Sequence, residues 1–132
     1  MCLLSSHFLP KFTFKPKKVY KCLIEDKRKS LCAPYYPGFR YECGVIYKNS
    51  LSFRQLNNAW KGSGFFHSFL YLDGALQLKC HLEILKALYS VVIYECEIPR
   101  FSFYYTGYHI NTERWSGEIC STKLRVVRKV CI

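Results

Sequence analysis

The chain has 132 residues, 50% of them hydrophobic, and a formal net charge of +11 at pH 7. This length suits one domain with one core, and no run approaches the ~20 consecutive apolar residues that a membrane-spanning helix needs. Residues 1–10 lack the basic start and the unbroken apolar stretch of a signal peptide, so we expect the protein in a cytoplasm.

Residues 1–18 are expected to form a basic N-terminal arm, followed by a single α+β domain over 19–132. Pro10 and Pro16 disfavour helix in the arm, which is expected to run extended over the surface.

Most of the domain is predicted to be strand, because β-forming residues alternate or run together between turn signals. A charged turn is expected at 25–30, and Pro37 with Gly38 suits a type II turn over 36–39. Polar loops are expected at 51–63 and 109–118. The expected strands cover residues 19–25, 31–33, 40–48, 64–69, 90–98 and 103–108, and residues 119–121 with 124–132 together complete the sheet.

Helical spacing of apolar residues follows the strand at 64–69, with Asp73 as the expected N-cap. Residues 77–81 either continue one helix or separate two. The apolar positions are Leu72, Ala75, Leu76, Leu82, Ile84, Leu85, Ala87 and Leu88. The order strands, helix, strands indicates an α+β fold, with a largely antiparallel sheet of six or seven strands and one or two helices.

The eight cysteines are expected to be free thiols, because a cytoplasm is reducing and most of these residues fall in apolar runs. No Cys-x-x-Cys exists, and no His pair lies three to five residues apart. We therefore expect neither a metal site nor a cofactor.

Basic residues gather at both ends of the chain, while the middle is nearly balanced. Such a field favours a polyanionic partner: a nucleotide, a nucleic acid or an acidic protein. Aromatic residues make up 17% of the chain, and rings beside basic groups bind bases and phosphates. The expected ligand-binding residues are Tyr20, Lys21, Arg40, His67, Ser68, Tyr105, Arg114, Ser121 and Arg125.

Strand alternation places Phe65, His67 and Phe69 on one face, and Phe66 with Ser68 on the other. Phe65 and Phe69 are the better core candidates, so His67 is expected to turn inward with them and to need a hydrogen-bonding partner.

Several short motifs resemble a loose group of small proteins encoded by phages and prophages, over about residues 18–130. The chain departs from the group's pattern at an extra Phe before His67 and at Arg100, where a turn glycine is expected. The resemblance implies a phage accessory protein that acts in the cytoplasm of a bacterial host. The motifs cover residues 19–21, 31–34, 41–44, 64–69, 75–76, 96–99, 104–107 and 120–124.

A second resemblance is to the ADP-ribosyltransferase core. It implies that Glu118 polarises the ribose 2′-hydroxyl of NAD, with Lys21 on an early strand and His67 and Ser68 on a middle strand.

The function expected from these features is a non-enzymatic phage accessory protein that binds a nucleotide, a nucleic acid or an acidic host factor, in counter-defence or host takeover. One alternative is an ADP-ribosyltransferase-like enzyme, and another is a virion-associated structural protein. No membrane partner is expected, and self-association stays open.

Overall fold

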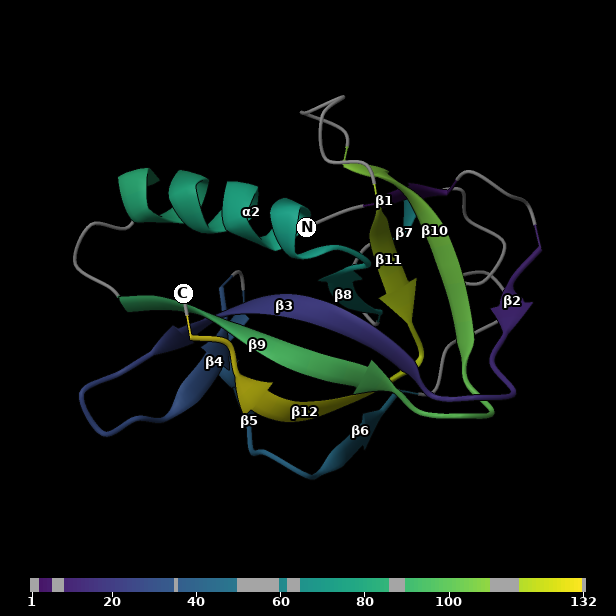
Figure 1. Cartoon of the computed structure of the whole chain (residues 1–132), viewed down its shortest axis with the longest axis horizontal. Helices are drawn as coiled ribbons and strands as arrows, with labels where there is room; N and C mark the ends of the chain where they lie inside the picture. Colours follow the sequence, from purple (N-terminus) through teal and green to yellow (C-terminus); the bar gives the residue numbers. More distant parts are fainter. Residues whose placement is uncertain are drawn as a thin grey trace.

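A computed structural model describes residues 3–5, 9–34, 36–49, 60–61, 65–85, 90–109 and 117–131 (Figure 1). Its strands are β1 (Leu3–Ser5), β2 (Lys11–Phe12), β3 (Lys17–Glu25), β4 (Leu31–Ala33), β5 (Tyr36–Tyr41), β6 (Ile46–Lys48), β7 (Trp60–Lys61), β8 (Phe66–Phe69), β9 (Ser90–Ile98), β10 (Phe103–His109), β11 (Glu118–Ser121) and β12 (Lys123–Lys129). The helix is α2 (Leu72–Leu85).

The described strands form one twelve-stranded sheet, with the main order β6-β12-β9-β3-β8-β11-β10-β1-β7. Its ladders are antiparallel, which confirms the largely antiparallel sheet. Over the described residues the fold is mainly β with one helix, and the strands outnumber the six or seven expected. β1, β2 and β7 were not expected, because no periodicity is visible over two or three positions, and the strand expected over 40–48 is divided into β5 and β6.

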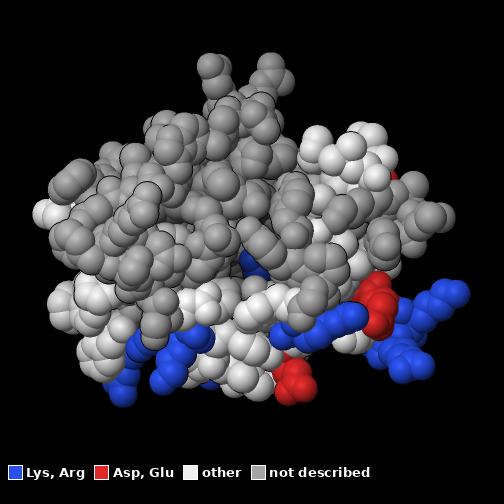
Figure 2. Space-filling model, turned by 180° about the vertical axis from the view of Figure 1, so that it is seen from behind, with Lys and Arg blue, Asp and Glu red and all other residues white. Residues whose placement is uncertain are grey.

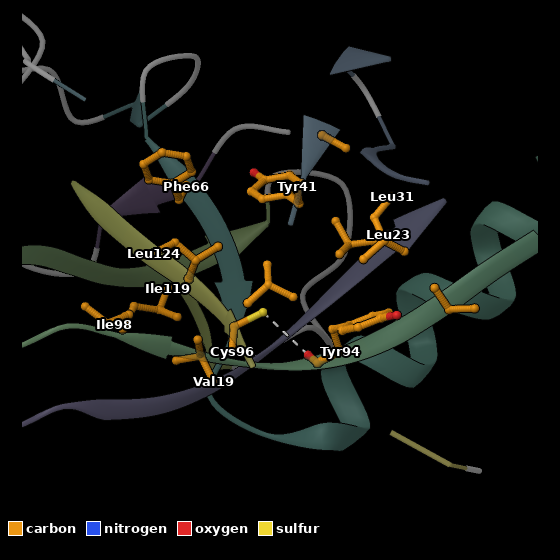
Figure 3. Close-up of a cluster of buried hydrophobic side chains, with 13 residues drawn as sticks. Val19, Leu23, Leu31, Tyr41, Phe66, Tyr94, Cys96, Ile98, Ile119 and Leu124 are labelled. Atoms are coloured by element: carbon orange, nitrogen blue, oxygen red, sulfur yellow. Dashed lines mark hydrogen bonds between the residues drawn. The ribbon is translucent and has the colours of Figure 1, made fainter. Parts of the chain in front are cut away.

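β3 and β9 form the centre of the sheet and pair over nine residues without a register shift, from Lys17↔Ile98 to Glu25↔Ser90. Both strands were expected from their apolar character. Odd-numbered β3 residues such as Val19 and Leu23 face the main core, whose side chains come from seven strands (Figure 3). This cluster comprises Val19, Leu23, Leu31, Ala33, Tyr41, Phe66, Val92, Tyr94, Cys96, Ile98, Ile119, Leu124 and Val126.

The helix α2 packs across the opposite face of β3, β8 and β9 (Figure 1). Ala75, Leu78 and Leu82 are buried against Cys22, Phe69, Val91 and Ile93 and form a second cluster, the helix-side core. Gly74 permits this approach, because a Cβ at that position would lie 2.6 Å from Cδ1 of the Phe69 ring.

Residues 77–81 continue one helix rather than break it. Asp73 lies within the first turn of α2, so its prediction as N-cap is wrong by one or two positions. Ile84 and Leu85 were expected on the apolar face but are 80% and 63% exposed. The buried stripe follows Gly74, Ala75, Leu78 and Leu82 instead, and it ends one turn before these two residues. None of the helical residues that the structure describes belongs to a helix that is long and apolar enough to span a bilayer.

The type II turn expected over 36–39 is wrong, because these residues belong to β5. β5 pairs only with β4, through a ladder with a register shift, and a proline is tolerated on such an edge strand. The single strand expected over 40–48 is divided at Gly44, which has a φ of +84°. β5 before it pairs with β4, and β6 after it pairs with β12. Glu118, expected in a loop, is the first residue of β11.

The expected basic arm contributes two strands to the sheet. β1 pairs with β10 and β7, and β2 pairs with the start of β10.

Candidate functional site

Four sequence-predicted residues meet where β3, β8 and β11 adjoin. Lys21, His67, Ser68 and Glu118 are all buried, with 8%, 7%, 0% and 0% of their surface exposed. We call them the buried polar cluster. The register brings Glu118 opposite Phe69, so that its side chain shares a face with His67, while Ser68 lies on the other face opposite Ile119.

Lys21 bridges a point where two strands separate. β3 and β8 pair only at Tyr20↔Phe69, and beyond this pair Lys21 Nζ donates a hydrogen bond of 2.5 Å to the carbonyl of His67. The amine also lies 5.8 Å from the centroid of the Tyr41 ring. Burial lowers the pKa of Lys21, and nearby groups that include Glu118 oppose this shift. Lys21 therefore links β3 to the backbone of β8 beyond the last paired residues of the two strands.

His67 and Glu118 form a buried acid–base pair. His67 Nδ1 lies 3.7 Å from Oε1 of Glu118, and this contact is an ion pair when the imidazole is protonated. Neither carboxylate oxygen of Glu118 accepts a hydrogen bond from a residue that the structure describes. Burying a carboxyl group without such a bond costs free energy, which the packing around it has to offset.

The other predicted ligand residues are dispersed. Tyr105 and Ser121 are fully buried, and burial raises the pKa of Tyr105. Tyr20 is half-buried beside the helix-side core. Arg40 lies on β5, 3.5 Å from Asp26, and Arg125 lies on β12, 3.1 Å from Glu97. Arg114 lies outside the described residues. The eight described positions thus do not form one site.

Four cysteines, Cys22, Cys32, Cys96 and Cys120, are buried free thiols, while Cys43, Cys80 and Cys131 are exposed. Desolvation raises the pKa of both Cys22 and Cys96 to about 12, so neither is a ready nucleophile. Over the described ranges, no three His, Cys, Asp or Glu side chains come together as a metal site would require.

β2 lies beside the turn between β9 and β10 (Figure 1), and these two segments carry an exposed group of rings. Phe12, Phe14, Phe101 and Phe103 are 37%, 76%, 53% and 44% exposed. The centroid of Phe12 lies 5.1, 6.1 and 5.1 Å from those of Phe14, Phe101 and Phe103. We call these four rings the Phe platform. Contiguous exposed rings of this kind mark binding surfaces.

Two buried hydroxyl residues hold the platform together. Thr13 Oγ1 donates to the carbonyl of Pro99 at 2.9 Å and accepts from the amide of Ser102 at 3.0 Å. The backbones of Thr13 and Ser102 also bond directly, at 2.9 Å, and the amide of Phe101 donates to the carbonyl of Thr13. These bonds hold Phe101 at a φ of +64°, which is unusual for a bulky residue. Such strain concentrates at functional sites.

The platform is surrounded by positive charge. Segments 9–18 and 99–104 contain no Asp or Glu. Lys11, Lys15 and Arg100 are exposed, and the Arg100 guanidinium lies 5.2 Å from the centroid of the Phe101 ring. Figure 2 shows that Lys and Arg side chains gather along the lower edge of the face it presents, with fewer acidic groups among them. The rings therefore project into a field that attracts anions.

Sequence reasoning missed the platform, although a signal was present. Residues 11–14 read Lys-Phe-Thr-Phe and residues 100–103 read Arg-Phe-Ser-Phe, so both follow the pattern basic, Phe, hydroxyl, Phe. In an extended chain this alternation turns the hydroxyl to one face and both rings to the other, although in the second segment Phe101 adopts a turn conformation with a φ of +64°. Thr13 and Ser102 are indeed 5% and 0% exposed.

Comparison with known proteins finds no family model, no curated protein and no solved structure that matches this chain. The resemblances to phage accessory proteins and to ADP-ribosyltransferases therefore stay predictions from the sequence.

Proposed function

We propose that the protein binds single-stranded nucleic acid, with bases stacked on the Phe platform and phosphates attracted by the surrounding lysines and arginines. The observation that carries this proposal is the exposed cluster of four phenylalanine rings within a segment free of acidic residues. Stacking of bases on aromatic rings combined with a basic surface is how proteins hold single strands without reading their sequence.

The rigid presentation of the rings favours this function over a purely structural role. Burying a phenylalanine stabilises a fold by about 1.5–3 kcal/mol, and four adjacent rings forgo part of that gain. The hydrogen bonds between Thr13 and Ser102 keep the rings positioned before any ligand arrives. A preorganised surface loses less conformational entropy on binding.

The NAD-transferase alternative depends on Glu118, which is fully buried and therefore out of reach of a nucleotide in this conformation. The platform is the better-supported site, because its groups are exposed. A counter-defence or host-takeover role, as the phage resemblance implies, would then act through nucleic acid.

Fluorescence anisotropy with a labelled oligothymidylate tests the proposal. Phe101→Ala and Phe103→Ala should each weaken binding by about 1–3 kcal/mol, the usual contribution of one stacked base. Tyr71→Ala is the control, because Tyr71 is 65% exposed and lies against Gly117, beside the start of β11, which pairs with the end of β10 opposite to Phe103. Affinity should fall with salt, with a log–log slope of about −0.7 for each phosphate contacted.

Absence of binding at low salt would overturn the proposal, as would equal losses in the platform and control variants. Equally tight binding of a polyglutamate peptide, unaffected by the ring substitutions, would assign the surface to an acidic protein instead.

A further inference from the structure

A row of basic side chains on β12 begins at the Phe platform. Lys123 Nζ donates a hydrogen bond of 3.2 Å to the carbonyl of Phe101, which ties the start of β12 to the platform. Arg125 follows two residues later and shares its face of the sheet with Lys123.

A β-bulge extends the row to Arg128. Arg125 pairs with Glu97 and Arg128 with Glu95. The two arginines are three positions apart in the chain, whereas the two glutamates are only two positions apart. Positions three apart normally point to opposite faces of a strand, and the additional residue, Val127, returns Arg128 to the face of Arg125. We call Lys123, Arg125 and Arg128 the β12 track.

Two carboxylates hold the track in place without neutralising it. Glu95 lies between Lys18 Nζ, at 3.0 Å, and Arg128 Nη2, at 2.9 Å, so two cations share one carboxylate. Arg125 Nη2 lies 3.1 Å from Glu97. The carboxylates order the arginines, and the strip keeps a net positive charge.

We infer that the β12 track binds backbone phosphates of the same single strand whose bases stack on the Phe platform. This inference rests on the proposed function and adds the path of the ligand. A guanidinium that pairs with a carboxylate has the geometry to pair with a phosphate. From Lys123 to Arg128 the track spans about 13–16 Å at ~3.3 Å per residue. A very short oligonucleotide bound at the platform therefore does not reach Arg128 at the far end of the track.

Oligonucleotides of two lengths test the path. The variant with both Arg125→Gln and Arg128→Gln should bind an oligothymidylate of about twelve nucleotides more weakly, by about fivefold for each lost contact near 0.1 M salt. The log–log slope of affinity against salt concentration should become shallower by about 1.4. Binding of an oligomer of about three nucleotides, held at the platform, should change less than twofold. Glu97→Gln, which releases Arg125, should tighten binding of the longer oligomer.

The control removes two charges from the turn between β3 and β4, with Arg28→Gln and Lys29→Gln, at the end of β3 remote from the platform. Circular dichroism confirms that each variant is folded. An equal loss in the control, or a similar loss for both oligomers, would overturn the path while leaving platform binding intact. If the wild type binds neither oligomer, the proposed function fails, and the path fails with it.

Discussion

At the scale of single residues, charged and polar side chains occupy two different environments. Lys21, His67 and Glu118 are buried and hold three strands together, while the basic residues around the Phe platform are exposed. The same residue types therefore stabilise the core in one place and, in the proposed function, bind a ligand in the other, and the two groups differ in burial.

His67→Ala should reduce stability and spare binding. The substitution removes a buried ring and leaves the carboxylate of Glu118 without its neighbour at 3.7 Å. Removing one partner of a buried polar contact in this way costs about 1–3 kcal/mol. Urea denaturation measures the loss, with His81→Ala on the exposed side of α2 as the control. Loss of oligonucleotide binding with unchanged stability would instead place His67 in the ligand site.

Residue types alone pointed to the buried polar cluster but not to its role. Alternation along 65–69 indicated that His67 turns inward with Phe69, and the structure confirms both as buried. The partners of His67 come from β3 and β11, which are distant in sequence, so no local pattern reveals whether the cluster opens to solvent.

At the scale of elements, the closest packing lies between α2 and β8. Gly74 sits directly over the ring of Phe69, which is 1% exposed and belongs to the helix-side core. The absence of a side chain at this position sets how closely the helix approaches the sheet.

Gly74→Ala should therefore destabilise the fold, although the same change usually stabilises a helix by about 0.5–1 kcal/mol. The new Cβ would lie 2.6 Å from Cδ1 of a ring that has no room to move, and such overpacking costs about 1–3 kcal/mol. Thermal unfolding measures the change. In a Phe69→Leu background the penalty should shrink. A higher melting temperature for Gly74→Ala alone would show that the helix is not packed as described.

The longest elements were predictable, and three of the shortest were not. β3, β9 and α2 have enough positions to display their apolar pattern. β1, β2 and β7 exist because partner strands offer them hydrogen bonds, which is tertiary information. The edge position that lets β5 contain Pro37 is likewise invisible in the sequence.

At the scale of the whole molecule, the fold brings basic residues of the N-terminal segment next to the basic turn after β9. The N-terminal segment and the turn after β9 are remote in sequence, yet Thr13 joins them through bonds to Pro99 and Ser102. The platform thus depends on the completed sheet, and a protein that unfolds should lose the platform and its binding together.

Photo-crosslinking with a 5-bromouridine oligonucleotide, read by peptide mass spectrometry, tests the central claim most directly. The rings of the Phe platform should stack on the modified bases, so crosslinks should map to residues 11–15 and 100–103 and diminish in the Phe101→Ala variant. Crosslinks concentrated in the turn at 26–30, or spread evenly over the basic surface, would contradict the assignment of the Phe platform as the nucleic-acid site.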